Sequence, residues 1–472
     1  MINTITIGGL RGFGKERTIS FAKPDGINEG SGLTFIVGAN NTGKTTIAEA
    51  LRAFNCVGQF QAPTFSSDKR NTRYNGGKVF LQLTNTDGTV FTIKTVDAGG
   101  SMTNLSTSGS ASWKSQEIYV LNSRRSVPYE FPRHEQDKRS YLSNQLVARS
   151  SRSPYLEDFG ARLNVMNKSE NRALIDPLLK FILGMDLEWT IDETINRNCF
   201  LKIKTNGVEH ISEGMGDGVW SIFTICDALY DLEDDQTLII DEPELSLHPV
   251  YQKRVMKLLK RVAKKKQIII STHSPYFVDA ECLINGAILV RTHKDEEGNI
   301  EVFSLGDSKK VIQGLINDLN QPHIFGIEAK EIFFQEDNVI VTEGQDDVVF
   351  FQKAADELSV DLSGSFFGWG AGGATKIPHI LEILQQLGYK KVSAIFDGDR
   401  EDQYIRVKNL FPQYNCIIIS QEDVRDKPAV DAKEAKIGLF ERNGTIKEQN
   451  KEEVKKLFEG LNNYFRGAHD QL

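Results

Sequence analysis

The hydrophobic positions of this chain follow two patterns, continuous apolar runs and strict alternation with polar residues. Continuous runs predict buried strands of a parallel sheet, and they occur at Leu33–Val37, Thr237–Ile240 and Gln267–Ser271. Alternation across Val79–Thr84 and Val90–Val96, with the turn dipeptide Asp87-Gly88 between them, predicts a hairpin. Because a helix-sized interval separates the last two apolar runs, we expect a parallel α/β core in the first half of the chain.

The remaining segments of the first half carry weaker patterns. Ala98–Ser112 is rich in Gly, Ser and Thr, which is typical of a surface loop. Arg124–Arg172 is polar and basic with few β-branched residues, so we expect it to be helical. Ala287–Val290 and Ile300–Ser304 predict another hairpin, and Asp307–Glu336 is expected to be helical and bridging.

The second half of the chain shows a shorter α/β pattern. Its predicted strands are Val339–Thr342, Val392–Phe396 and Cys416–Ser420, and its predicted helices are Asp346–Leu358 and Ile377–Leu387. A glycine-rich turn, Gly368–Gly373, precedes the second helix. We therefore expect a first domain over residues 1–305 with a helical insert at about 124–185, a helical linker over 306–336, and a second domain over 337–472.

Composition and charge narrow the function only slightly. The 472 residues are 40% hydrophobic and 25% charged, which is enough to fold two or three domains. The net charge of −8 argues against coating of nucleic acid by the whole surface. The five cysteines lack CxxC spacing, which favours a reducing, cytoplasmic setting over a disulfide framework or zinc ribbon. Met1–Leu10 does not resemble a signal peptide, and no stretch approaches the ~20 apolar residues of a membrane span.

A phosphate-binding motif follows the first apolar run. Gly38–Thr45 matches G-x-x-x-x-G-K-[ST] in full, between a predicted strand and a predicted helix. The glycines let backbone N–H groups wrap the phosphates of ATP at a helix N-terminus, while Lys44 reaches the β- and γ-phosphates and Thr45 ligates Mg²⁺. The expected ATP contacts are Gly38, Asn40, Asn41, Thr42, Gly43, Lys44, Thr45 and Thr46.

An acidic pair ends the second apolar run. Asp241 would hold the Mg²⁺ shell, and Glu242 would orient or deprotonate the attacking water. Adjacent carboxylates at a strand end are costly unless a cation or a substrate proton compensates them. The pair lies far downstream of the phosphate-binding loop, so a lobe must be inserted between the two motifs.

Two further features resemble ABC-type ATPases of the RecF/SMC-like branch. The segment 211–215 (ISEGM) is similar to the LSGGQ-like signature of that family, from which it departs at its third and fifth residues. His273 follows the third apolar run and matches the family's switch histidine, so we expect it to contact the γ-phosphate. In this family the signature of one subunit completes the ATP site of the other. The resemblance therefore implies a homodimer in which Ser212 and Gly214 contact ATP.

A second set of carboxylates lies at strand ends in the second α/β pattern. Glu343 and Asp347 follow one predicted strand, and Asp397 and Asp399 follow another. Alternation puts Asp397 and Asp399 on one face, where they could share a cation, with Glu343 on a neighbouring strand. Hard carboxylate ligands favour Mg²⁺ or Mn²⁺ over zinc, and two such ions can clamp a phosphodiester.

This arrangement, with its glycine-rich turn between the acids, resembles a Toprim domain over about residues 338–420. The resemblance implies that Glu343 acts as acid/base and metal ligand, and that Asp397 and Asp399 hold metal. Asp347 matches an extra acid of the nuclease branch. The family also implies a downstream lysine, and the sequence leaves four candidates open: Lys427, Lys433, Lys436 and Lys447.

Two basic segments are candidates for DNA contact. Residues 253–266 carry eight Lys and Arg beside an apolar stripe, which a solvated helix packed on the sheet explains more simply. A second basic cluster lies in the expected insert, where ABC-type DNA proteins track phosphates. Its members are Arg124, Arg125, Arg133, Lys138, Arg139, Arg149 and Arg152.

The order of the two domains resembles the OLD family, which includes anti-phage nucleases such as Gabija nuclease subunits and retron-associated effectors. The implied fold is α/β: an ABC-type P-loop ATPase with an inserted helical lobe, then a Rossmann-like Toprim domain. The implied activity is ATP-regulated, Mg²⁺- or Mn²⁺-dependent DNA cleavage in prokaryotic defence. The implied partners are DNA, further copies of the chain, and a defence-system partner, either a protein or a reverse transcriptase with its nucleic acid.

Two other functions stay open at this point. A non-cleaving repair factor of RecF/RecR type would bind DNA without cutting it. An ATP sensor would gate a separate effector protein. Four retained carboxylates count against both, because a domain that only binds has no need to keep Glu343, Asp347, Asp397 and Asp399 together.

Overall fold

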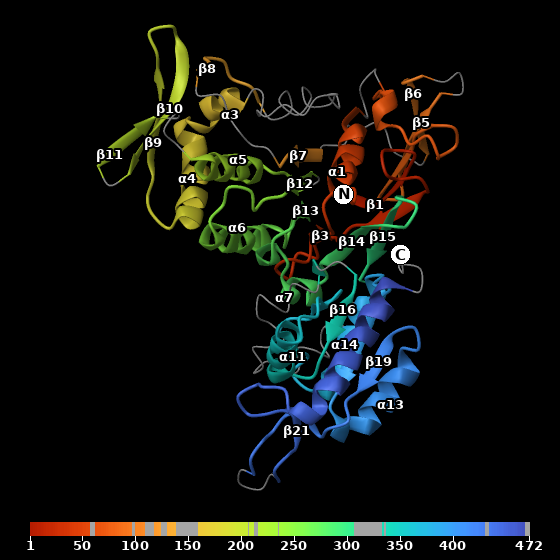
Figure 1. The fold of residues 1–472 in the computed structure, drawn as a ribbon. Coiled ribbons are helices and arrows are strands. Elements are labelled where there is room, and N and C mark those ends of the chain that lie inside the picture. The colour runs from red at the N-terminus through yellow and green to blue at the C-terminus, as the bar shows by residue number, and fades with distance from the viewer. Residues whose placement is uncertain are drawn as a thin grey trace. The chain divides into compact units, whose positions relative to one another are not determined.

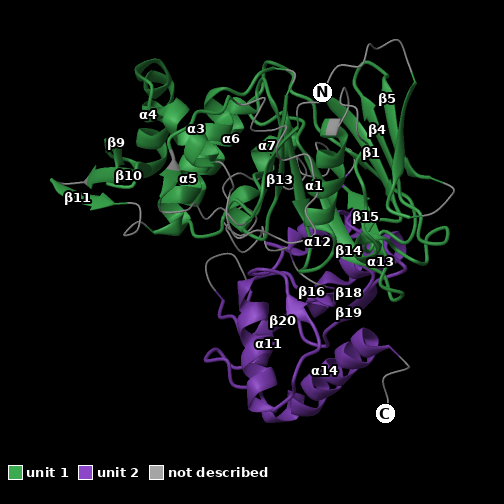
Figure 2. Ribbon diagram, turned by 90° about the horizontal axis from the view of Figure 1, so that it is seen from above, with its two compact units in different colours: residues 1–304 green, residues 305–472 purple. Residues whose placement is uncertain are grey.

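The computed structural model describes residues 1–472 apart from 57–61, 97–99, 109–117, 124–129, 138–158, 206, 212–215, 235, 306–332, 335–336, 430–433 and 468–472. The chain divides into two compact units, unit 1 over Met1–Ser304 and unit 2 over Leu305–Leu472 (Figure 2). The expected linker over 306–336 lies almost entirely outside the described residues. None of the helices in the described part of the chain has both the length and the apolar character that a bilayer crossing requires.

Unit 1 is built on a six-stranded sheet in the order β15-β14-β3-β13-β12-β7 (Figure 1). Neighbouring strands are parallel except β14 and β15. The strands are β3 (Leu33–Val37), β7 (Ile118–Leu121), β12 (Thr237–Asp241), β13 (Gln267–Ser271), β14 (Ile288–Lys294) and β15 (Ile300–Ser304). The continuous apolar runs of the sequence form β3, β12 and β13, and all their residues are buried, as in a sheet covered on both faces.

A second sheet of unit 1 is antiparallel, in the order β2-β1-β4-β5-β6. Its strands are β1 (Ile2–Gly8), β2 (Arg17–Ser20), β4 (Phe80–Asn85), β5 (Val90–Thr95) and β6 (Thr103–Ser108). The predicted hairpin is confirmed by the pairing of β4 with β5. The prediction of a loop over Ala98–Ser112 was wrong where β6 extends the hairpin, because every residue of β6 pairs with a residue of β5. Helix α1 (Lys44–Ala53) shares one apolar core with both sheets.

The inserted lobe of unit 1 contains helices and a small sheet. Helices α3 (Phe159–Met166) and α4 (Ser169–Leu183) fall in the segment expected to be helical, but β8 (Phe131–Pro132) interrupts it. Three strands that the sequence did not predict follow the helices. They are β9 (Glu188–Glu193), β10 (Asn198–Thr205) and β11 (Val208–Ile211), and β10 pairs with β8, β9 and β11.

A buried ion pair joins the lobe to the rest of unit 1. Arg162 of α3 is 1% exposed and donates to Asp227 across 2.7 Å. Asp227 lies on α5 (Asp217–Tyr230), is 0% exposed, and also accepts from the Tyr119 hydroxyl of β7 at 3.2 Å. Arg162 contacts Asp231 as well, at 2.7 Å. The guanidinium is therefore neutralised on two sides, which is what burial of a charge requires.

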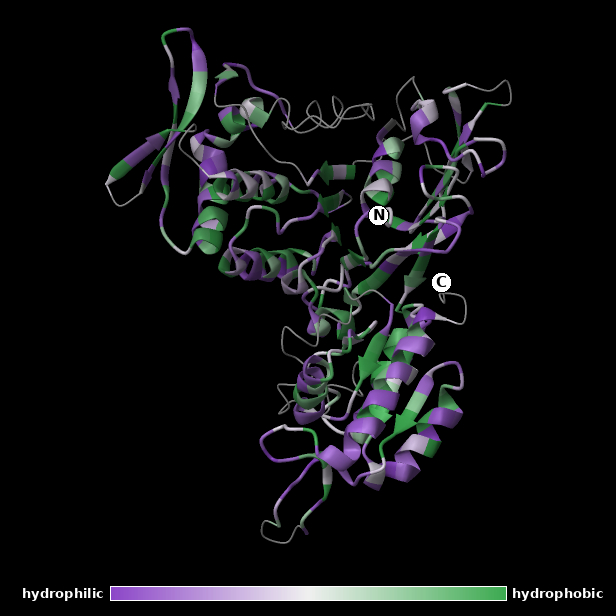
Figure 3. Ribbon diagram, in the orientation of Figure 1, coloured by the Kyte–Doolittle hydropathy of each residue, from purple (hydrophilic) through white to green (hydrophobic). Residues whose placement is uncertain are grey.

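Unit 2 has a parallel four-stranded sheet in the order β17-β16-β18-β19. The strands are β16 (Val339–Val341), β17 (Ser365–Phe366), β18 (Val392–Phe396) and β19 (Asn415–Ile418). The helices are α11 (Gln345–Glu357), α12 (Ile377–Gln386), α13 (Glu401–Leu410) and α14 (Lys451–Arg466), and a parallel pair, β20 (Asp423–Arg425) and β21 (Gly438–Phe440), lies beside α11. Figure 3 shows the strands in apolar colours, while α14 carries both polar and apolar residues.

Candidate functional site

The phosphate-binding loop of unit 1 connects β3 to α1. Gly38 and Gly43 have φ of 145° and 95°, and a Cβ on Gly38 would lie 2.3 Å from the carbonyl oxygen of Thr292. Glycine is therefore required at Gly38 by both backbone conformation and space. The Lys44 ammonium donates to the carbonyls of Gly38 and Ala39 at 2.9 Å each. Burial lowers the pKa of Lys44 to about 8, against the opposing effects of Glu242 and Asp241.

The remaining loop residues divide by exposure. Asn40 and Asn41 are exposed at the turn, while Thr42 and Thr46 are 4% exposed. The Thr42 hydroxyl donates to Ala39 O at 2.8 Å and contacts the Thr292 hydroxyl at 2.7 Å, so it shapes the loop. The expected signature residues Ser212 and Gly214 lie outside the described residues.

Asp241 and Thr45 meet although 196 positions separate them. The Thr45 hydroxyl donates to Asp241 Oδ2 across 3.0 Å, and the Ser271 hydroxyl donates to the other oxygen of the same carboxylate. Two hard oxygen donors therefore lie side by side at the start of α1, in an arrangement whose chemistry fits Mg²⁺. The geometry depends on β12 and β13 being adjacent parallel strands.

Glu242 and His273 lie at the ends of the same two strands. Their closest atoms, Glu242 Oε1 and His273 Nε2, are 3.7 Å apart. Glu242 has a φ of 49°, a strained value for this residue type, and its backbone N–H donates to Ser271 O at 2.8 Å. Burial, with a smaller effect of Lys44, lowers the pKa of His273, so the imidazole is neutral at pH 7.

Glu244 is a functional candidate that the sequence analysis missed. Its carboxylate accepts from the Thr272 hydroxyl at 2.7 Å and from the His273 backbone N–H at 2.6 Å. It thereby fixes the turn that presents His273. Only the cluster of acids in Asp241-Glu242-Pro243-Glu244 hints at this role in the sequence.

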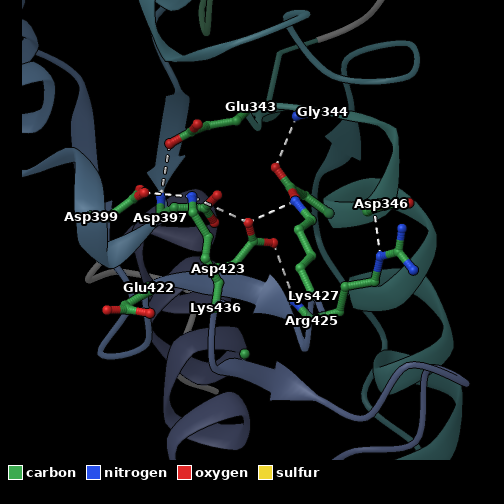
Figure 4. Close-up of polar contacts among 12 residues, drawn as sticks. Glu343, Gly344, Asp346, Asp397, Asp399, Glu422, Asp423, Arg425, Lys427 and Lys436 are labelled. Carbon is green, nitrogen blue, oxygen red and sulfur yellow. Dashed lines mark hydrogen bonds and ion pairs between the residues drawn. The ribbon is translucent and has the colours of Figure 1, made fainter. Parts of the chain in front are cut away.

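In unit 2, a hydrogen bond joins the ends of two strands that carry acids. The Asp397 backbone N–H, after β18, donates to Glu343 Oε1, after β16, across 2.9 Å (Figure 4). Asp347, in the first turn of α11, accepts from the Gly344 N–H at 2.9 Å. Glu343, Asp347 and Asp397 are 8%, 7% and 9% exposed. The two strand ends and the first turn of α11 thus bring three nearly buried carboxylates close enough for their charges to interact.

The glycine-rich turn packs against the same strand end. Gly373 N–H donates to Glu343 O, and Ala371 N–H donates to Thr342 O, both at 2.8 Å. A Cβ on Gly370 would lie 2.6 Å from backbone atoms of Gly344. Glycine at position 370 lets the turn approach the acids closely, and its φ of 82° adds a second reason for glycine.

The charges of these acids act on one another. Burial raises the pKa of Asp397, and the nearby charges of Asp347 and Glu343 raise it further. Burial also raises the pKa of Asp347 and that of Glu343. Carboxylates whose pKa is raised by burial and by like charge gain from a cation that neutralises them.

The sequence analysis missed Asp423, which completes the acidic set of Glu343, Asp347, Asp397, Asp399 and Asp423. It begins β20, is 1% exposed, and receives the Lys427 ammonium at 2.6 Å and that of Lys436 at 3.6 Å. Lys436 also contacts Asp399 (Figure 4). Arg400 lies 3.3 Å from Asp399 and 3.7 Å from Glu343. An acid a few residues after β19 gives no sequence signal that separates it from a turn residue.

The structure separates the four candidate lysines. Lys427 and Lys436 contact the acidic set through Asp423, and Lys436 reaches Asp399 as well. Lys447 instead pairs with Asp426 at 2.6 Å. Lys433 lies outside the described residues.

The acidic set fits a divalent cation in its chemistry. Its donors are carboxylate oxygens, which Mg²⁺ and Mn²⁺ prefer, and their charges repel one another. The described part of the chain contains no group of three or more acidic, histidine or cysteine side chains placed to hold a metal ion. The protein's own cations, on Arg400, Lys427 and Lys436, contact the carboxylates instead.

The basic helix α6 (Pro249–Val262) is largely a packing element. Arg254 donates to Ile182 O at 3.0 Å, and Arg261 lies over the ring of Phe181. Lys260 and Lys266 pair with Glu281 and Asp234. In the second basic cluster, Arg133 pairs with Glu193 at 3.1 Å; its other members lie outside the described residues.

Two family models match unit 1. Residues 1–95 match a model described as an AAA ATPase domain, and residues 83–279 match one described as an AAA domain, putative AbiEii toxin, Type IV TA system. Unit 1 is therefore similar to AAA ATPase domains, which implies nucleotide binding.

Several curated proteins are similar to the chain at low identity. The Septu protein PtuA of Bacillus thuringiensis is 24% identical over 61% of this chain and 77% of its own length. The OLD nuclease of Thermus scotoductus is 32% identical over 26% of this chain and 24% of its own length. Endonuclease GajA of Bacillus cereus is 24% identical over 46% and 37% of the two chains. The chain thus spans well under half of the two relatives named as nucleases, and these similarities support a relationship to OLD-like ATPases and nucleases.

Solved structures of SMC head domains are also similar. A head bound to the C-terminal winged-helix domain of ScpA has a TM-score of 0.41 and 14% identity, over 65% of this chain and 97% of that one. The SMC head domain of Thermotoga maritima has a TM-score of 0.38 and 13% identity, over 65% and 99% of the two chains.

Proposed function

We propose that this protein is an ATP-binding and ATP-hydrolysing, divalent-cation-dependent DNA endonuclease of the OLD type, acting in prokaryotic defence against phage. Unit 2 would be its Toprim nuclease domain, over about residues 337–472. The observation that carries the proposal is the hydrogen bond from Asp397 N–H to Glu343 Oε1. It brings carboxylates from two separate strand ends together beside Asp347 and Asp423. Their like charges repel one another, so the grouping would only destabilise a protein that did not use it for chemistry.

Within unit 2, each acidic residue has a proposed role. Glu343 serves as the general acid/base, since burial raises its pKa toward the working pH. Asp347, Asp397 and Asp399, with Glu343, would hold Mg²⁺ or Mn²⁺. Such a cation, when bound, would polarise the phosphodiester and activate a water. Arg400 and Lys436 lie at the rim, 46% and 31% exposed, where they can receive the phosphates of DNA.

Unit 1 would regulate cutting through ATP. Lys44 binds the phosphates, Thr45 and Asp241 hold Mg²⁺, and Glu242 orients the attacking water beside His273. By analogy with ABC-type ATPases, two copies would associate through unit 1, with Ser212 and Gly214 of one copy contacting the ATP of the other. The defence role is supported by the names of the relatives alone, and so is a defence-system partner.

Supercoiled plasmid incubated with the purified protein tests the proposal. Mg²⁺ or Mn²⁺ should support nicking, and the Glu343→Ala/Asp397→Ala double variant should not cut. Reactions with and without ATP give the direction of regulation. Equal cutting by wild type and double variant would refute the assignment of the acidic set.

A further inference from the structure

One exposed aromatic side chain stands on the turn that packs against Glu343. Trp369 is 40% exposed and lies between Gly368 and Gly370. Other large aromatic side chains of unit 2 pack against each other, as in the group of Phe351 with Phe366, Phe440 and Phe458. Within the described residues, no ring or cation contact of Trp369 is present. Leaving an indole ring exposed to water is unfavourable in free energy unless another group packs over it.

The backbone of Trp369 is fixed to the acidic site. Gly370 N–H donates to Phe367 O at 3.0 Å, which closes a tight turn with Trp369 at its corner. Phe367 N–H donates to Ile340 O, and Gly373 N–H to Glu343 O, both at 2.8 Å. The turn is therefore tied to the strand end on both sides of the tryptophan, and Gly370 leaves no room for it to move toward Gly344.

Two other exposed apolar side chains of unit 2, both on α13, lack this fixation. Ile405 and Leu410, 48% and 55% exposed, lie on α13, and scattered aliphatic residues of this kind are normal on protein surfaces. Trp369 differs in having a flat π face, in lying on a turn of left-handed glycines, and in being bonded through that turn to the residue proposed as acid/base.

We propose that Trp369 is a substrate-stacking residue, which receives an unpaired base next to the phosphodiester that unit 2 cuts. The inference rests on the proposed nuclease function and names its substrate class. A base inside a duplex is stacked on both faces, so only a single-stranded or locally unpaired segment can offer a free face to an indole. The exposed cations Arg400, Lys427 and Lys436 supply the phosphate contacts that such a strand needs.

The test measures binding of a fluorescein-labelled single strand, and of the same strand in a duplex, by full-length protein with Mg²⁺. The Glu343→Gln background prevents cutting during the measurement. Trp369→Ala should weaken single-strand binding by about 5- to 150-fold, the range of base–aromatic stacking, and leave duplex binding unchanged. Trp369→Phe should retain most of the affinity, and the control Ile405→Ala should have no effect.

An abasic nucleotide moved along the strand separates stacking from a structural role. At one position in the strand, the abasic nucleotide should weaken binding to the protein that retains Trp369 and leave binding to Trp369→Ala unchanged. The missing base and the missing indole are the two halves of one contact, so removing the second has no further effect. If Trp369→Ala does not fold, Trp369→Leu replaces it, since leucine keeps apolar bulk without a π face. Equal losses on single strand and duplex, or no position dependence, would overturn the inference.

Plasmid and oligonucleotide cutting by wild-type protein distinguish the two proposals. No cutting, together with Trp369-dependent binding of single strands, would refute the nuclease function and keep the stacking residue. Normal cutting and binding by Trp369→Ala would refute the stacking residue and keep the nuclease.

Discussion

The backbone N–H of Asp397 donates to Glu343 Oε1 across 2.9 Å, in a position where both residues are nearly buried. Glu343→Gln keeps an acceptor oxygen but loses the charge and the acid/base function. We expect its cutting to fall by about 100-fold or more, with little change in stability. Glu343→Ala leaves the N–H unpaired and should also lose about 1–3 kcal/mol of stability. Plasmid nicking measures the loss of cutting, and urea unfolding measures the loss of stability. Equal stability of Glu343→Gln and Glu343→Ala would contradict the stabilising role of this hydrogen bond.

The raised pKa values of Asp347 and Asp397 predict an unusual pH dependence of stability without divalent cations. The folded state binds these protons more tightly than the unfolded state, so the stability they contribute is full below about pH 4 and is lost as pH rises. Asp397→Asn should therefore melt above the wild-type protein at about pH 8 in EDTA, and this advantage should shrink toward about pH 5.

Added Mg²⁺ or Mn²⁺ supplies the control for this pH effect. Either cation should raise the Tm of the wild-type protein at about pH 8 and leave Asp397→Asn nearly unchanged, because binding to the folded state stabilises it. Differential scanning fluorimetry with and without EDTA measures both. Parallel Tm curves for the two proteins across pH would contradict the prediction.

Lys436 should matter for cutting more than Lys447. Lys436 contacts both Asp399 and Asp423, whereas Lys447 pairs with Asp426. Loss of a hydrogen bond to a charged group costs about 1.5–3 kcal/mol, so Lys436→Ala should reduce cutting about tenfold or more. Lys447→Ala serves as the matched control and should cut at the wild-type rate. The reverse order of effects in a plasmid assay would reject the assignment.

Two substitutions separate ATP binding from ATP hydrolysis in unit 1. Lys44→Ala removes the ammonium that lies over the phosphate-binding loop, so nucleotide binding should be lost. Glu242→Gln keeps the shape of the site and removes the base, so ATP should still bind while phosphate release slows about 100-fold or more. Nucleotide-binding and phosphate-release assays measure these effects. Wild-type hydrolysis by Glu242→Gln would exclude it as the base.

The buried pair of Arg162 and Asp227 should stabilise unit 1 strongly. Removing one partner leaves a charge uncompensated, so Arg162→Met should cost about 3–5 kcal/mol in urea unfolding. Lys180→Met is the control, because Lys180 and Asp186 are 60% and 82% exposed and should contribute about 0–1 kcal/mol. Similar losses from both substitutions would show that burial is not the cause.

The central strands of both units were predictable because their signals are local. A continuous apolar run followed at once by glycines and Lys44 specifies a strand, a turn and a helix in one contiguous segment. Glu343 and Asp397 likewise follow buried strands directly, and parallel pairing then brings the strand ends together. These inferences needed only adjacency in the sequence and the geometry of a parallel sheet.

The parts that were not predictable depend on distant pairing. Asp423 reads as a turn residue until Lys427 and Lys436 fold back over it. Strand β10 has an alternating pattern, but its place in the lobe depends on β8, which precedes it by more than sixty residues. The sequence favoured a packed helix for the basic run of α6, but it gave no sign that Arg254 and Arg261 contact the lobe.

The order of the chain has a consequence for synthesis of the protein. Asp423, Lys427 and Lys436 all follow β19, and the strand β21 that pairs with β20 ends only at Phe440. A ribosome that has completed the P-loop, the strand ends of Glu343 and Asp397, and even β19 has still not supplied these side chains. Under the proposed nuclease function, nascent chains would therefore be unable to cut DNA until this late segment has emerged and folded.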